Sequence, residues 1–222
     1  MKRITFLSLL CAAVAFPQVA ENANKGYKTK EGREAVARTL ADPARDERLR
    51  PREIVAALDL KHGNAVADVG TGVGFMLPYF SQAVGDGGQV FAEDISNDFL
   101  DKAKARVELQ RLKNVKFVLG TDRDPKLPAD TLEAVLLLDV YHHFDYPEAM
   151  LEHIRDSLLT DGRLAIVDFY KRPEAMPGNR ALEHIRLDMD DVIREVEQNG
   201  FRLASKHEWI PKEVYMAIFV KK

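Results

Sequence analysis

This chain of 222 residues has a single cysteine, no long apolar run and no excess of positive charge. The single cysteine, Cys11, excludes an internal disulfide framework and any zinc site built on several thiolates. A formal net charge of −3 provides no basic field to attract nucleic acid non-specifically. The apolar run at residues 4–16 is shorter than the roughly 20 residues that a membrane-spanning helix needs. We therefore expect a folded protein that neither binds nucleic acid nor spans a membrane.

The N-terminus has the pattern of a secretory signal peptide. Lys2 and Arg3 precede the apolar run, and the Ala-Val-Ala sequence at residues 13–15 offers a cleavage site, with Ala20 as a second option. We expect residues 1–20 to be a signal peptide or an N-terminal anchor, and the protein to be exported if this leader is cleaved and cytoplasmic otherwise. A buried or amphipathic N-terminal helix, or a start codon placed too early, is the alternative. Residues 21–46 are expected to form a polar linker, over 21–30, and a helix, over 31–40.

From residue 51 onward, short apolar strands alternate with amphipathic helical patterns. This alternation predicts a parallel sheet with helices on both faces. The last two predicted strands are joined by a short connection, so they must pair antiparallel. The fold class expected over residues 47–222 is α/β, a three-layer αβα sandwich with a seven-stranded, mostly parallel sheet and an antiparallel C-terminal strand hairpin. The strands are predicted at residues 65–69, 89–92, 115–119, 134–138, 163–168, 201–208 and 214–220.

A glycine-rich loop follows the first predicted strand, with glycines at Gly70, Gly72 and Gly74. Doubly wound sheets bind ligands at this carboxyl edge, and glycines allow the backbone to approach a ligand closely. A dinucleotide fingerprint would place its third glycine at residue 75, where Phe75 stands. Asp68 would face a pyrophosphate unfavourably, but it suits a ligand that carries an ammonium group. A tight strand-to-helix turn without a ligand is the alternative interpretation.

A carboxylate pair ends the second predicted strand. Asp94 lies some 20 residues beyond the glycines, where a carboxylate can accept two hydrogen bonds from a ribose diol. Ile95 is placed to pack on an adenine face. The neighbouring Glu93 can be confused with Asp94, and Asp94 can alternatively serve only to precede the helix that begins after Ser96.

A further acidic position follows the third predicted strand. Asp122 can accept a hydrogen bond from an exocyclic amine at the same edge of the sheet. The sequence does not separate it from Thr121 or Asp124, and a solvated loop is an equal alternative.

With these residues in place, the chain resembles the class I S-adenosylmethionine (SAM)-dependent methyltransferases over residues 47–222. DVGTGVG resembles the cofactor loop of this family, EDIS its ribose-binding strand end, LLLDVYHHF its fourth motif, and SLLTDGRLAIVDF its helix–turn–strand segment. The resemblance implies SAM as the cofactor and S-adenosylhomocysteine (SAH) as its product. It implies that the methionine end is held by the loop, the ribose by Asp94 and the adenine by Asp122. The cofactor-binding residues expected are Asp68, Gly70, Thr71, Gly72, Gly74, Asp94, Ile95, Asp122 and Asp139.

Three residues after the fourth predicted strand are expected to carry the acceptor chemistry, namely Tyr141, His142 and His143. A histidine can act as a base near neutral pH if the nucleophile must lose a proton. The alternative is that these residues shape the loop without proton transfer. The segment 169–188 is either a cover that brings Tyr170 or His184 to the substrate or an ordinary crossover.

The sequence therefore predicts a SAM-dependent methyltransferase that acts on an unidentified acceptor, most plausibly a small molecule. A protein that binds SAM or SAH without turnover is the first alternative. A nicotinamide-dependent oxidoreductase is the second, and Phe75 and Asp68 disfavour it. No metal is expected, because the sequence has no H-x-x-E pair and no cluster of cysteines.

Overall fold

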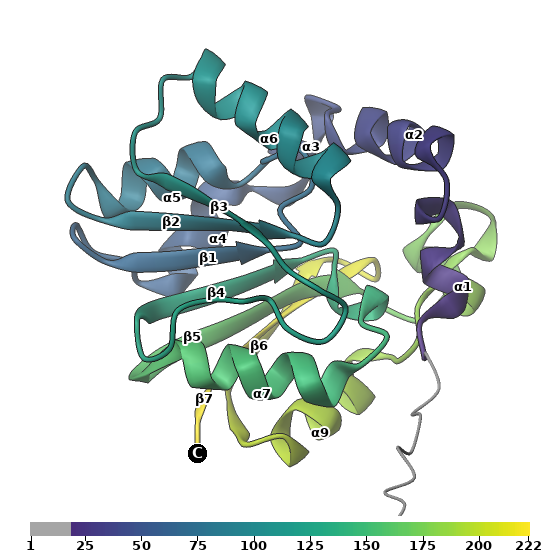
Figure 1. The fold of residues 1–222 in the computed structure, drawn as a ribbon. Coiled ribbons are helices and arrows are strands. Elements are labelled where there is room, and N and C mark those ends of the chain that lie inside the picture. The colour runs from purple at the N-terminus through teal and green to yellow at the C-terminus, as the bar shows by residue number, and fades with distance from the viewer. Residues whose placement is uncertain (1–18) are drawn as a thin grey trace, which may run out of the picture.

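A seven-stranded sheet runs through the centre of the protein, whose computed structural model describes residues 19–222 (Figure 1). The strand order is β3-β2-β1-β4-β5-β7-β6. Strands β1 to β5 pair in parallel, whereas β7 is antiparallel to both β5 and β6. This topology confirms the predicted fold class. The strands are β1 (Ala65–Val69), β2 (Gln89–Asp94), β3 (Val115–Leu119), β4 (Leu132–Leu138), β5 (Leu158–Phe169), β6 (Phe201–Ile210) and β7 (Val214–Lys221).

Helices cover both faces of the sheet because its central strands are apolar on both sides. In β4, Val135 and Leu137 join the core beneath α7 and α9, while Ala134 and Leu136 join the core beneath α4, α5 and α6. All four residues are fully buried, which explains the uninterrupted apolar run in this strand. The helices are α4 (Pro51–Leu58), α5 (Leu77–Val84), α6 (Asn97–Leu109), α7 (Pro147–Ser157) and α9 (Met189–Gln198).

The N-terminal segment is helical, so the prediction of a linker over residues 21–30 is wrong. This segment has no apolar periodicity, but side-chain hydrogen bonds attach it to the domain. The Asn24 side-chain amide and the Ala20 backbone N–H both donate to the Asp145 carboxylate, each at 3.1 Å. The helix predicted at 31–40 is present. The elements are α1 (Glu21–Asn24), η1 (Lys25–Tyr27), α2 (Lys30–Leu40) and α3 (Ala44–Leu49).

The predicted leader, residues 1–20, lies outside the described residues except for its last two positions. The signal peptide and the export that it implies therefore stay predictions. Between residues 19 and 222, no helix has the length and apolar character needed to cross a membrane.

The helix–turn–strand segment at residues 157–169 differs from its prediction. Helix α7 ends at Ser157, and β5 begins directly at Leu158 instead of at residue 163. Leu158 is fully buried and pairs with Leu132, and a register shift in β4 follows. Beyond β5, the segment 170–188 forms three short helical turns, which are η3 (Pro173–Ala175), η4 (Pro177–Asn179) and α8 (Ala181–His184).

Candidate cofactor site

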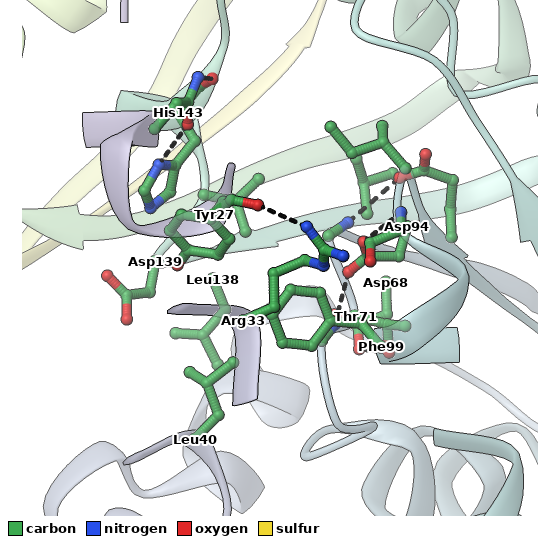
Figure 2. A pocket seen from close by; sticks show the side chains of 18 of the residues that line it. Tyr27, Arg33, Leu40, Asp68, Thr71, Asp94, Phe99, Leu138, Asp139 and His143 are labelled. Carbon is green, nitrogen blue, oxygen red and sulfur yellow. Dashed lines mark hydrogen bonds between the residues drawn. The ribbon is translucent and has the colours of Figure 1, made fainter. Parts of the chain in front are cut away.

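A cavity of about 640 Å³ lies at the carboxyl ends of β1, β2 and β4. Its volume falls within the range of roughly 300–1,000 Å³ that is typical of small-molecule sites. Figure 2 shows side chains from the N-terminal segment, among them Tyr27 and Arg33, lying beside those from the sheet end. The structure brings most of the predicted site residues together here. Those lining the cavity are Asp68, Gly70, Thr71, Gly72, Asp94, Ile95, Asp122, Asp139 and His143.

Two of the three loop glycines bring the backbone to the cavity, and the third serves helix packing. Gly70 and Gly72 have φ angles of 69° and 54°, which side chains rarely adopt. A Cβ at Gly70 would lie 2.6 Å from a methyl group of Val140. Gly74 does not line the cavity, and a Cβ there would lie 3.2 Å from the Cβ of Ala103 on α6. The close approach of α6 and a φ of 77° therefore both explain the glycine at position 74.

Asp68 is the penultimate residue of β1, and its carboxylate is buried in the cavity wall. The Thr71 hydroxyl donates to its Oδ2 at 2.7 Å. Burial, together with a smaller effect of the nearby Asp94, raises the pKa of the Asp68 carboxyl to about 7, and the Thr71 hydrogen bond opposes this rise. Near neutral pH this carboxylate therefore lacks a compensating positive charge, which a cationic ligand would provide.

Asp94 connects the end of β2 to the glycine loop. Its Oδ2 accepts from the Gly72 backbone N–H at 3.0 Å, and its Oδ1 accepts from the Ser96 N–H at 2.9 Å. Burial raises the pKa of the Asp94 carboxyl to about 6, against the effect of these backbone donors. The residue thus lies in the cavity as predicted and also supports the start of α6.

Glu93, which the sequence did not separate from Asp94, has a different environment. Its Oε2 accepts from the Gly70 N–H at 3.1 Å, whereas its buried Oε1 has no partner among residues 19–222. Burial raises the pKa of Glu93 well above its usual value, and Asp94 adds to this effect. The pKa values of Asp68, Glu93 and Asp94, which line the same wall, are all raised. Such a wall disfavours a bound anion and favours a bound cation.

The part of the cavity wall that residues 21–40 form, the N-terminal wall, is the part that sequence reasoning missed. Arg33 forms an ion pair with Asp98 at 2.7 Å and donates to the backbone oxygen of Tyr27 at 2.9 Å. The Tyr27 ring packs edge-on against His143, with centroids 4.7 Å apart. Thr29 provides the one sequence signal, since it is a preferred residue for the N-terminus of a helix and caps α2.

The structure brings only one of the three predicted acceptor residues to the cavity. His143 lines it, and burial lowers the pKa of this histidine well below its usual value. His142 is buried behind the wall, where its Nδ1 lies 2.7 Å from Asp168 Oδ1. Tyr141 is also buried and donates to Glu195 at 2.6 Å. The 3₁₀ turn η2 (Tyr141–His143) points these neighbouring side chains in different directions.

The remaining predicted positions, Ile95, Asp122 and Asp139, also line the cavity. Ile95 is 60% exposed although it lines the cavity, so one face of its side chain is free to meet a ligand. Asp139 has a φ of 62° and lies 3.7 Å from the Arg45 guanidinium. Burial raises the pKa of the Asp139 carboxyl, and Arg45 and His142 lower it in part.

Sequence comparison finds that the proteins similar to this chain include methyltransferases. Residues 67–166 match the methyltransferase domain family. The ubiquinone/menaquinone biosynthesis C-methyltransferase UbiE of Marinomonas sp. is 29% identical over 129 residues, which are 58% of this chain and 51% of that protein. Phosphatidylethanolamine N-methyltransferase of Cereibacter sphaeroides is 28% identical over 123 residues, which are 55% and 59% of the two chains. The chain thus spans about half the length of the curated relatives it matches.

Among solved structures, a SAM-dependent methyltransferase from Aquifex aeolicus superposes with a TM-score of 0.77 at 28% identity, covering 85% of this chain and 98% of that one. The sheet order, and the glycine loop beside buried carboxylates, define an α/β protein with a candidate cofactor site at the carboxyl edge of its sheet. The matched domain and the superposition support the resemblance to the class I SAM-dependent methyltransferases that the sequence shows. SAM is the methyl donor of this family, and SAH is the product.

Proposed function

We propose that this chain transfers a methyl group from SAM to a small-molecule acceptor. The observation that carries the proposal is the buried carboxylate pair, Asp68 and Asp94, on either side of the glycine loop. SAM carries an ammonium and a sulfonium, so a wall that disfavours anions suits it. In this proposal Asp68 accepts from the ammonium and the Gly70–Gly72 backbone holds the carboxylate.

The nucleoside half of the cofactor is assigned to the other side of the loop. Asp94 accepts from the ribose diol, and the exposed face of Ile95 packs on the adenine. Asp122 accepts from the exocyclic amine. Each of these three residues lines the same cavity, which supports their joint assignment to one ligand.

Methyl transfer itself requires little chemistry from the protein. A lone pair of the acceptor attacks the methyl carbon, the carbon–sulfur bond breaks, and its electron pair stays on sulfur. The protein must align the two reactants and exclude water. The N-terminal wall, with Tyr27 and Leu40, closes one side of the cavity.

The acceptor is proposed to carry an apolar portion. The cavity wall that follows β4 includes Leu138, Val140, Phe144 and Met150. Burial of apolar ligand surface against such side chains is favourable by roughly 25 cal/mol per Å². The two named relatives, a ubiquinone/menaquinone C-methyltransferase and a phosphatidylethanolamine N-methyltransferase, are compatible with this proposal.

The test is SAH formation by the full chain, measured with labelled SAM against a panel of quinols, phenols and amines that carry apolar groups. We expect at least one acceptor to give SAH in amounts that the Asp68→Asn variant does not produce. Tight SAH binding with no turnover across the panel would instead favour a SAM- or SAH-binding protein without activity.

The raised carboxyl pKa values predict that SAH binding depends on pH. Asp68 and Asp94, with pKa values of about 7 and about 6, must be ionised to accept from the ligand. Protons must therefore leave on binding at low pH, so the affinity is highest near pH 8 and falls as the pH drops through these values. We expect binding about tenfold or more weaker at pH 5 than at pH 8. Calorimetry in two buffers of different ionisation enthalpy measures the proton release, and a pH-independent affinity would contradict the assignment.

A further inference from the structure

Three histidines from two separate segments meet beside the cofactor cavity. His142 and His143 belong to the turn η2, and His184 ends α8. One ring nitrogen of each lies within 4.8 Å of those of the other two. The ring centroids of His142 and His143 are 4.0 Å apart, and those of His142 and His184 are 5.0 Å apart. Neutral imidazole is the commonest metal ligand in proteins, so the hydrogen bonds of each ring decide which nitrogens are available to a metal.

The hydrogen bonds of Asn24 fix the proton on His143. The Asn24 Nδ2 donates to the His143 backbone oxygen at 3.0 Å and to Asp145 Oδ2 at 3.1 Å. Its Oδ1 must therefore accept, and the His143 Nδ1 lies 2.9 Å from it. The proton of His143 is thus on Nδ1, which leaves a lone pair on Nε2.

Asp168 fixes the proton on His142 in the same way. The His142 Nδ1 donates to Asp168 Oδ1 at 2.7 Å, and the His142 backbone N–H donates to Oδ2 at 3.1 Å. The His142 side chain is only 3% exposed, and its buried Nε2 has no hydrogen-bond partner within the described residues. A buried ring nitrogen without a partner is costly unless a ligand satisfies it.

We propose that Nε2 of His142, Nε2 of His143 and a ring nitrogen of His184 bind one divalent first-row transition metal ion. Three imidazoles suit zinc, copper, iron and nickel, and three protein ligands leave a further position open. The carboxylate behind His142 and the amide oxygen behind His143 are the outer partners that orient metal-bound imidazoles. Bonds of about 2.1 Å require ligand nitrogens roughly 3.4 Å apart in a tetrahedral site, so nitrogens that lie as much as 4.8 Å apart must approach one another on binding.

A second group of possible ligands, Asp139, His142 and Asp168, lies within the same distance limit. It is disfavoured because the Asp168 oxygens already accept three hydrogen bonds, two from His142 and one from the Phe169 backbone N–H at 2.8 Å. Asp168 is therefore the partner that orients His142 and not itself a ligand. His143 lines the cofactor cavity, so the ion would lie at the wall of that cavity.

The test is a cobalt titration of the full chain, purified without a histidine tag and stripped with a chelator. We expect one equivalent of Co²⁺ to bind with micromolar affinity or tighter, to give visible absorption bands, and to be displaced by Zn²⁺. His184 is part-exposed, so His184→Ala avoids the disruption expected of replacing the buried His142, and it should weaken binding about a hundredfold. Asn24→Ala should weaken it about tenfold or more through the orientation of His143. His207→Ala, an exposed histidine on β6, is the matched control and should bind like the parent chain.

No Co²⁺ binding up to millimolar concentrations, or equal affinity in His184→Ala, would overturn the proposal. Loss of binding in Asp139→Asn with retention in His184→Ala would also overturn it, in favour of the carboxylate group. The metal proposal does not rest on methyl transfer. SAH calorimetry on the same samples therefore keeps a failure of the metal site distinct from a failure of the cofactor site.

Discussion

Asp68→Asn is expected to weaken SAH binding by about a hundredfold or more while leaving the ligand-free protein at least as stable at pH 8. The asparagine keeps the shape and an oxygen for the Thr71 hydroxyl, but it removes the charge that faces the ligand ammonium. Loss of one partner of a buried charge pair typically costs about 2–5 kcal/mol, which gives the expected factor.

The stability of the same variant follows from the sign of the pKa shift. The pKa of Asp68 is raised on folding to about 7, so the folded state favours the neutral form. The stability that this provides is present at low pH and is lost as the pH rises through about 7. Asparagine is neutral at every pH. The variant should therefore gain in melting temperature relative to the parent chain between pH 5 and pH 8.

Calorimetry with SAH and thermal unfolding at both pH values measure the two effects on one protein sample. An unchanged SAH affinity would remove Asp68 from the cofactor site. Weak binding together with a large loss of stability at pH 8 would mean that the variant damages the fold and not a ligand contact.

Asp94→Ala is expected to weaken SAH binding by about thirtyfold or more. The alanine removes the proposed partner of the ribose diol, and it also leaves the Gly72 and Ser96 N–H groups without their carboxylate acceptor. Hydrogen bonds to charged groups contribute about 1.5–3 kcal/mol each, so the ligand contact alone accounts for the factor. We also expect a lower melting temperature, because the glycine loop loses its attachment to β2.

Asp101→Ala is the matched control for this variant, since Asp101 is an exposed carboxylate on α6 that pairs with Lys104 at 2.9 Å. Isothermal calorimetry of both variants with SAH separates the site from a general change in charge. Equal affinities in the two variants would show that Asp94 does not contact the ligand.

The central strands were predictable because a strand that is buried on both faces has a continuous run of apolar residues. Residues 65–69 form β1 with the predicted bounds, and all but the first of them are buried. The edge strand β3 also has its predicted bounds, 115–119, although none of its residues is fully buried. The N-terminal segment was not predictable, because hydrogen bonds from Ala20 and Asn24 to Asp145, 121 or more positions away, hold it in place. Such long-range contacts have no local periodicity that a sequence pattern can reveal.

The site also has residues that could be placed from the sequence and residues that could not. The carboxyl ends of parallel strands meet at one edge, so Asp68, Asp94 and Asp122 could be placed together from the order of the strands. The direction of side chains in a 3₁₀ turn has no such rule, which is why Tyr141 and His142 were grouped with His143 at the acceptor. The sequence offered His184 as a residue near the substrate, but it did not group His184 with His142 and His143 as ligands, because His184 comes from a different segment and a motif requires close spacing.

The most direct test of the account is calorimetry of the full chain with SAH and, separately, with NAD at pH 8. The glycine loop beside Asp68 predicts one SAH bound per chain and no measurable heat from NAD. Binding of NAD without binding of SAH would contradict the assignment of this cavity to a cationic amino-acid nucleoside.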